Sequence, residues 1–156
     1  MVEREKSLIS FFSGVAMLIV LFDQLTKYFI YLRMPDWSLG FFSVHLVKNT
    51  GAGFGILQEK TFVLGVISLL VSLAVIFYYK KIPPQKLPQF LFALFLGGVV
   101  GNLIDRFARG YVIDFLDFTF WPAFNIADAS ITVGMIGIIF YFLNEEKEAK
   151  MKKEIK

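Results

Sequence analysis

The sequence predicts an all-α membrane protein with four transmembrane helices and a small extracytoplasmic β-sheet. Two observations place it in this class. The 156 residues are 56% hydrophobic and only 19% charged, with a mean hydropathy of +0.64. A soluble chain of this length would leave much of that apolar surface exposed to water. The second observation is that the apolar residues gather in four separate segments. We therefore expect a single integral membrane domain over residues 1–156.

The four apolar segments approach the roughly 20 residues that a helix needs to cross the hydrocarbon core. We place them at about residues 8–32, 62–79, 87–104 and 125–143. The first resembles a secretory signal, because its apolar run follows Arg4 and Lys6. No small-x-small cleavage site follows it, however, so we expect a retained membrane helix.

The basic residues predict how these helices are oriented. One side of the membrane would hold ten Lys and Arg residues: Arg4, Lys6, Lys80, Lys81, Lys86, Lys147, Lys150, Lys152, Lys153 and Lys156. The other side would hold five: Arg33, Lys48, Lys60, Arg106 and Arg109. Because basic loops stay in the cytoplasm, we expect both termini inside and the two longer loops outside. Basic residues beside membrane helices suit orientation rather than nucleic-acid binding.

Two stretches outside the predicted helices favour β-strands. Leu39–Leu46 and Gly110–Phe120 are rich in aromatic and β-branched residues. Both belong to the outer loops, so we expect a small sheet on the outer surface. Trp37 and Trp121 suit anchoring at the membrane interface.

Polar clusters mark the outer ends of the predicted helices. They are Asp23–Lys27, Gly101–Arg106 and Asn125–Asp128, with a fourth, Asn49–Gly55, in the first outer loop. Asp23 lies about sixteen residues into the first segment, roughly 24 Å across a core about 30 Å thick. Ionisable groups near membrane depth are expensive and mark functional sites by default. Their shared depth predicts one site at the outer boundary.

The available chemistry is that of paired carboxylates. The chain has no cysteine and a single histidine, His45, so thiolate chemistry and a multi-histidine metal site within one chain are excluded. No phosphate-binding loop or nucleophile elbow is present. Two carboxyl groups that share a proton can hydrolyse an amide without metal or cofactor, one activating water and the other protonating the carbonyl oxygen. The candidates are Asp23, Asp105, Asp114, Asp117 and Asp128.

Each candidate also has a structural interpretation. Asp23 and Lys27 are four residues apart and can form an ion pair on one helix face. Asp105 can pair with nearby basic groups. Asn125 and Asp128 fit a helix N-cap with an acid in the first turn, and Asp117 fits a solvated loop acid. Residue spacing alone does not separate these interpretations from catalysis.

Four motifs occur in order along the chain. They are Asp23-Gln24-Leu25-Thr26-Lys27, Asn49-Thr50-Gly51-Ala52-Gly53-Phe54-Gly55, Gly101-Asn102-Leu103-Ile104-Asp105-Arg106 with Gly110-Tyr111-Val112-Ile113-Asp114-Phe115, and Phe124-Asn125-Ile126-Ala127-Asp128. Together they resemble the lipoprotein signal peptidases, also called signal peptidase II. The resemblance covers about residues 20–135.

This resemblance implies an aspartyl endopeptidase of the bacterial inner membrane. Such enzymes remove signal peptides from diacylglyceryl-modified prolipoproteins, cutting before the lipidated cysteine. Asp114 and Asp128 match the family's catalytic pair. Supporting or substrate-binding positions would be Asp23, Lys27, Asn49, Gly51, Asn102, Arg106 and Asn125. We expect no cofactor or metal, lipidated prolipoproteins and membrane lipid as partners, no nucleic acid, and a monomer. One departure is Gly53, where the family usually has alanine.

Two other function classes fit the composition. A transporter or proton relay would also place carboxylates in membrane helices, but spread through the bilayer depth. The inner halves of the four predicted segments lack acids, which disfavours it. A non-catalytic assembly factor would tolerate neutral replacements of Asp114 and Asp128.

Overall fold

The computed structural model describes residues 2–53 and 56–154. Phe54 and Gly55 of the outer-loop motif and Lys156 of the basic tail lie outside the described residues. The helices are α1 (Val2–Arg33), α2 (Thr61–Phe77), α3 (Lys86–Ala108) and α4 (Ile126–Glu154), with a short 3-10 helix η2 (Tyr79–Lys81). The strands are β1 (Asp36–Leu39), β2 (Phe42–Asn49), β3 (Val112–Phe118) and β4 (Trp121–Phe124). The predicted fold class is confirmed.

Three of the helices, α1, α3 and α4, are long and apolar enough to cross a membrane. The fourth, α2, is an apolar helix of 17 residues. At 1.5 Å per residue it is about 26 Å long. The helix α4 continues through the charged tail to Glu154, beyond the predicted apolar segment. Ion pairs at i,i+4 spacing stabilise that extension, with Lys150 on Glu146 and Lys152 on Glu148.

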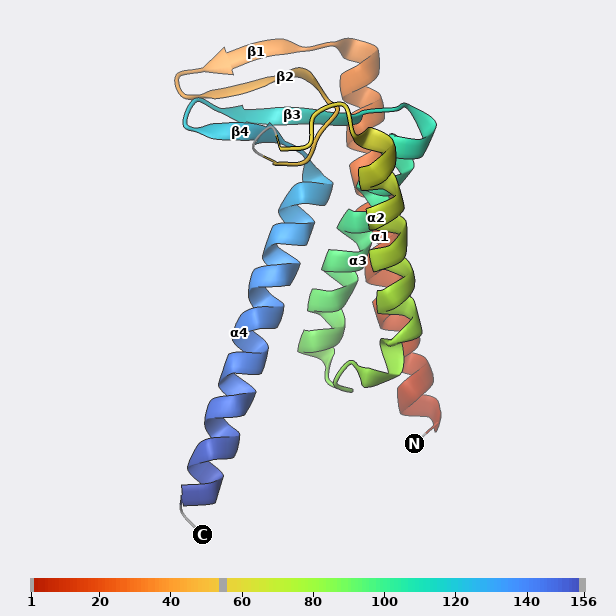
Figure 1. Cartoon of the computed structure of the whole chain (residues 1–156), viewed down its shortest axis with the longest axis vertical. Coiled ribbons are helices and arrows are strands. Elements are labelled where there is room, and N and C mark those ends of the chain that lie inside the picture. The colour runs from red at the N-terminus through yellow and green to blue at the C-terminus, as the bar shows by residue number, and fades with distance from the viewer. Residues whose placement is uncertain (1, 54–55, 155–156) are drawn as a thin grey trace.

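The helix α3 is the centre of the bundle. It packs against α1, α2 and α4 (Figure 1), and its span is the most buried of the three long ones. Small residues permit this packing. A Cβ added at Gly134 of α4 would lie 2.8 Å from both the Leu91 carbonyl oxygen and the Phe95 nitrogen of α3. The two backbones therefore meet at a distance that only glycine allows at this position.

The four strands form one antiparallel sheet in the order β1-β2-β3-β4. Figure 1 shows it at the end of the bundle away from both termini. The predicted stretch Leu39–Leu46 is divided by a turn, where Gly40 has φ of +59°. The strand β4 was not predicted, because it is only four residues long and contains Pro122. Ile113 and Phe115 of β3 pack with Ile30 of α1, which fixes the sheet to the helices.

We predict that Gly134→Ala destabilises the bundle while Gly14→Ala does not. The added methyl group at position 134 must displace the α3 backbone, and overpacking of this kind costs about 1–3 kcal/mol. At Gly14 of α1 no atom lies within 4 Å of the added Cβ, and alanine is the better helix former. Thermal unfolding in detergent measures both. Equal midpoints for the two variants would contradict the close α3–α4 contact.

Candidate active site

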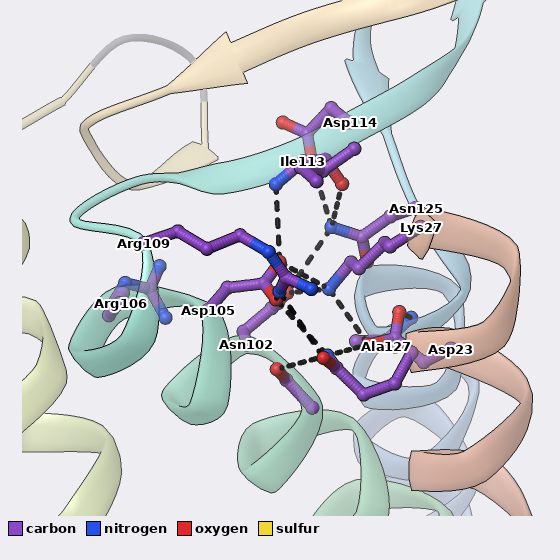
Figure 2. Close-up of polar contacts among 12 residues, drawn as sticks. Asp23, Lys27, Asn102, Asp105, Arg106, Arg109, Ile113, Asp114, Asn125 and Ala127 are labelled. Atoms are coloured by element: carbon purple, nitrogen blue, oxygen red, sulfur yellow. Dashed lines mark hydrogen bonds and ion pairs between the residues drawn. The ribbon is translucent and has the colours of Figure 1, made fainter. Parts of the chain in front are cut away.

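The polar residues predicted to form one site come together where the helices α1, α3 and α4 meet the strands β2 and β3. Asp23 and Lys27 project from α1, and Asn102 and Asp105 from α3 (Figure 2). Asp114 lies on β3. Asn125 directly precedes α4, and Asp128 lies in its first turn. Segments more than 100 residues apart in the sequence thus contribute to one hydrogen-bond network.

Asn125 links the two aspartates of the predicted catalytic pair. Its Nδ2 donates to Asp114 Oδ1 at 2.7 Å, while its Oδ1 accepts from the Asp128 backbone nitrogen at 2.9 Å. The Asn125 backbone nitrogen donates to Asp128 Oδ2 at 3.3 Å. The helix-cap interpretation is therefore correct. The same fully buried amide also holds Asp114 beside the start of α4.

Asn102 joins the pair to a buried cation. Its Nδ2 donates to Asp128 Oδ1 at 2.8 Å, and its Oδ1 accepts from Lys27 Nζ at 2.9 Å and from Asn125 Nδ2 at 3.2 Å. An ammonium group can only donate, so Lys27 determines which end of the Asn102 amide faces it. The NH2 group must then face Asp128.

Lys27 is itself the centre of a fully buried ion cluster. Its Nζ lies 2.8 Å from Asp23 Oδ2 and 3.1 Å from Asp105 Oδ2, and all three side chains are buried. Asp105 also pairs with Arg109, and Asp23 Oδ1 accepts from the Ala127 nitrogen at 2.9 Å. The ion-pair interpretations of Asp23 and Asp105 are both correct. The cluster binds α1, α3 and α4 together.

Gln24 and Arg109 also belong to this network, although neither was predicted to be a site residue. Gln24 Nε2 donates to Asp23 Oδ2, to Asp105 Oδ1 and to the Gly101 carbonyl oxygen, each at 3.1 Å. Arg109 Nη1 donates to Gln24 Oε1 at 3.2 Å. The available signal was the i,i+4 spacing of Asp105 and Arg109.

Asp114 is 1% exposed. Its Oδ2 accepts from Asn49 Nδ2 at 2.9 Å. Burial raises the pKa of Asp114 from 3.8 to about 7, and the charge of Asp128 adds to the rise. The hydrogen bonds from Asn49 and Asn125 act in the opposite direction, because they favour the ionised form. A carboxyl group with this pKa can hold or release a proton near neutral pH.

A cavity of about 200 Å³ opens beside Asp128. Asp128, Asn49 and Arg106 line it together with residues of β4. Asp128 is half-buried, whereas Asp114 is closed off. Arg106 Nη1 donates to Ser68 Oγ of α2 at 3.3 Å. Its buried Nε has no hydrogen-bond partner among the described residues.

The outer-loop motif forms a tight turn beside this cavity, with Asn49 in the cavity lining. Asn49 Oδ1 accepts from the Gly51 nitrogen at 2.9 Å, which closes a tight turn. A Cβ at Gly51 would lie 2.8 Å from the Ile56 carbonyl oxygen, so glycine is required there. At Gly53 no described atom lies within 4 Å of an added Cβ. Position 53 is where the sequence differs from the family, which usually has alanine. An alanine side chain would therefore fit at this position.

Asp117 is not part of this network. Its carboxylate lies 3.5 Å from His45 Nε2, and both side chains are 35% exposed. This fits the solvated-acid interpretation. Across residues 2–53 and 56–154, no group of three or more His, Asp or Glu side chains is arranged to hold a metal ion.

The fold and the site define a polytopic membrane protein with a buried carboxylate centre at one end of its helices. Residues 15–144 match the family model of signal peptidase (SPase) II. The chain therefore belongs to the signal peptidase II family, a family of proteases.

Known relatives agree with this membership. The chain is 42% identical over 135 residues to a lipoprotein signal peptidase of Moorella thermoacetica, covering 83% of this chain and 90% of the relative. It is 46% identical over 125 residues to one of Caldanaerobacter subterraneus, covering 76% and 86%. It also resembles a bacterial membrane enzyme solved by the in meso method at 2.3 Å, with a TM-score of 0.80, 32% identity, and coverage of 86% and 88%.

We predict that Lys27→Met strongly destabilises the protein and that adding Asp23→Asn restores most of the loss. The single variant leaves Asp23 and Asp105 buried with only Arg109 to balance them, and an uncompensated buried charge costs about 3–5 kcal/mol. The double variant returns the cluster to neutrality. Thermal unfolding of both variants in detergent measures the effect. A single variant as stable as the parent would show that the cluster does not hold the helices together.

Proposed function

We propose that this chain is an intramembrane aspartyl endopeptidase that removes signal peptides from diacylglyceryl-modified prolipoproteins, cutting before the lipidated cysteine. The main support is that Asp114 and Asp128 are both hydrogen-bonded to Asn125, and that the charge of Asp128 acts on Asp114. Two carboxyl groups that interact in this way can share one proton.

The proposed reaction needs one proton held by the pair and one water molecule. The ionised carboxylate takes a proton from water as the water oxygen attacks the scissile carbonyl carbon. The protonated partner gives its proton to the carbonyl oxygen, which forms a tetrahedral intermediate. Collapse of this intermediate breaks the C–N bond. The leaving nitrogen takes up the proton that water lost, and the carboxylate that gave its proton takes one back from a hydroxyl group of the intermediate, which restores the pair. Because the pair titrates as a unit, either aspartate can fill either role.

The position of the site suits such a substrate. The signal peptide is a membrane helix whose lipidated cysteine would lie at the outer leaflet. The carboxylates lie at the sheet end of the helices, which the positive-inside rule assigns to the outer side of the bacterial inner membrane, with both termini in the cytoplasm. Water is available at that boundary and scarce at the bilayer centre.

The alternative function, a proton relay, is disfavoured because the helices lack ionisable residues through most of their length. Between Lys6 and Asp23, α1 has no acidic or basic residue, and α3 has none between Lys86 and Asp105. The helix α2 has none at all. A relay across the bilayer needs ionisable groups through its depth, so hydrolysis at one boundary is the better supported function.

We predict that Asp114→Asn and Asp128→Asn each abolish cleavage, while Asp117→Asn does not. Loss of a general acid or base removes about 10²–10⁴-fold in rate, whereas Asp117 lies outside the network. The measurement is the gel shift of a lipidated precursor in proteoliposomes containing each folded variant. The assignment fails if either of the first two variants turns over at the parent rate.

We predict that the cleavage rate falls as pH rises above about 7. The raised pKa of Asp114 means that the proton of the pair is lost in this range. Asn49→Ala removes a donor that favours the ionised form, so the falling limb should move to higher pH. A pH–rate profile of each variant measures the shift.

His45→Asn is the control, because His45 is the single histidine of the chain and contacts Asp117, which lies outside the network. The falling limb should stay in place when His45 is replaced. If the falling limb of the pH–rate profile shifts in His45→Asn but not in Asn49→Ala, the titrating group is not the aspartate pair.

A further inference from the structure

Two cavities that the proposed active site does not use adjoin each other beside α1. The larger, about 760 Å³, is a groove between α1, α2 and α3. The smaller, about 360 Å³, lies at the end of the bundle away from the sheet, near η2. Ile9 and Tyr79 line both cavities. Tyr79, whose ring packs edge-on against Phe12 with 5.0 Å between centroids, therefore lies where the groove and the smaller cavity meet.

The groove has the dimensions and lining of a hydrocarbon site. Its walls are almost entirely apolar and include Phe12, Val20, Ile76 and Leu96. Along α1 it runs from Ile9 to Gln24, which is about 22 Å at 1.5 Å per residue. One leaflet contributes about half of a 30 Å hydrocarbon core. The groove is therefore long enough for a complete acyl chain, and its apolar walls offer water almost no hydrogen-bond partners.

The smaller cavity has a mixed polar and apolar lining, and Gln89, one of its lining residues, carries an unsatisfied acceptor. Gln89 of α3 is only 2% exposed. Its Nε2 donates to the Pro83 carbonyl oxygen at 3.3 Å, but its buried Oε1 has no partner among the described residues. A buried acceptor without a donor is costly. Glu5 and Lys80 line the same cavity, which adds one negative and one positive group.

We propose that the two cavities together bind one inner-leaflet phospholipid with a protonated amine in its headgroup, of the phosphatidylethanolamine class. An acyl chain lies in the groove. The ammonium donates to Gln89 Oε1 and faces Glu5, while the phosphate faces Lys80. The basic η2 turn marks this end as cytoplasmic. The site is separate from Asp114 and Asp128, so it does not depend on the proposed peptidase function.

The headgroup chemistry separates this lipid from its competitors. Phosphatidylcholine has a quaternary ammonium with no N–H, so it cannot satisfy Gln89 Oε1. Phosphatidylglycerol has no cation to oppose Glu5. N,N-dimethyl-phosphatidylethanolamine is the informative probe, because it retains one N–H while approaching the bulk of the choline headgroup.

The first experiment measures lipid retention by native mass spectrometry. Delipidated full-length protein in mild detergent receives each of the four lipids with identical acyl chains. We expect phosphatidylethanolamine and its dimethyl analogue to bind at least tenfold more tightly than phosphatidylcholine or phosphatidylglycerol. Equal retention of the ethanolamine and choline lipids, or a preference for phosphatidylglycerol, would overturn the proposal.

The second experiment tests the residues with matched variants. Gln89→Leu preserves buried volume and removes the unpaired acceptor, and it should abolish the tenfold preference over phosphatidylcholine. Lys80→Met should weaken retention, whereas Lys81→Met should not. Lys81 has the same charge but lies outside the smaller cavity, over the Tyr78 ring at 4.8 Å. Equal effects of the two lysine variants would indicate unspecific charge attraction and refute the site.

A further pair covers the case in which Gln89→Leu fails to fold. Glu5→Gln removes the carboxylate that faces the ammonium. The matched control is Glu3→Gln, because Glu3 is also an exposed acid of α1 but lies outside the smaller cavity. We expect only Glu5→Gln to reduce ethanolamine-lipid retention. If both variants bind as the parent does, the headgroup assignment is wrong.

Discussion

The arrangement of the site depends on the buried ammonium of Lys27. It balances Asp23 and Asp105 and also donates to Asn102. Because a buried charge is tolerated only with partners and hydrogen bonds, these four side chains must stay together. They come from α1 and α3, so the crossing of these two helices is fixed at this depth. The contacts of Asn102 with Asp128 and of Asn125 with Asp114 extend from that crossing to the carboxylate pair.

As a consequence, the side-chain amides that contact Asp114 and Asp128 are fixed in one orientation. Lys27 orients the Asn102 amide toward Asp128, and Asn125 is held by Asn102 while it holds Asp114. Each amide therefore has a structural and an electrostatic role at once. This explains why the cap and ion-pair interpretations did not compete with a functional one. The same contacts satisfy both.

The helices and the gathering of polar residues were predictable from sequence because burial in a membrane restricts both. An apolar segment without charges has few alternatives to a helix, and shared depth brought Asp23, Asn102 and Asn125 to one end. The strand β4 and the role of Arg109 were not predictable in the same way. A four-residue strand has no periodicity to detect, and the contact of Arg109 with Gln24 depends on how α1 and α3 cross. A single sequence does not determine how two helices cross.

The helix α2 connects the two cavity systems through its limited packing. It contacts chiefly α3 within the bundle, so its two flanks have few contacts with the other helices. On one flank, Ser68 accepts from Arg106 at the edge of the carboxylate cavity. On the other, Ile76 lines the apolar groove. Lipid in that groove would supply the apolar contacts that α1 does not make with α2. The geometry of Arg106 therefore depends on how firmly α2 is held from its far side.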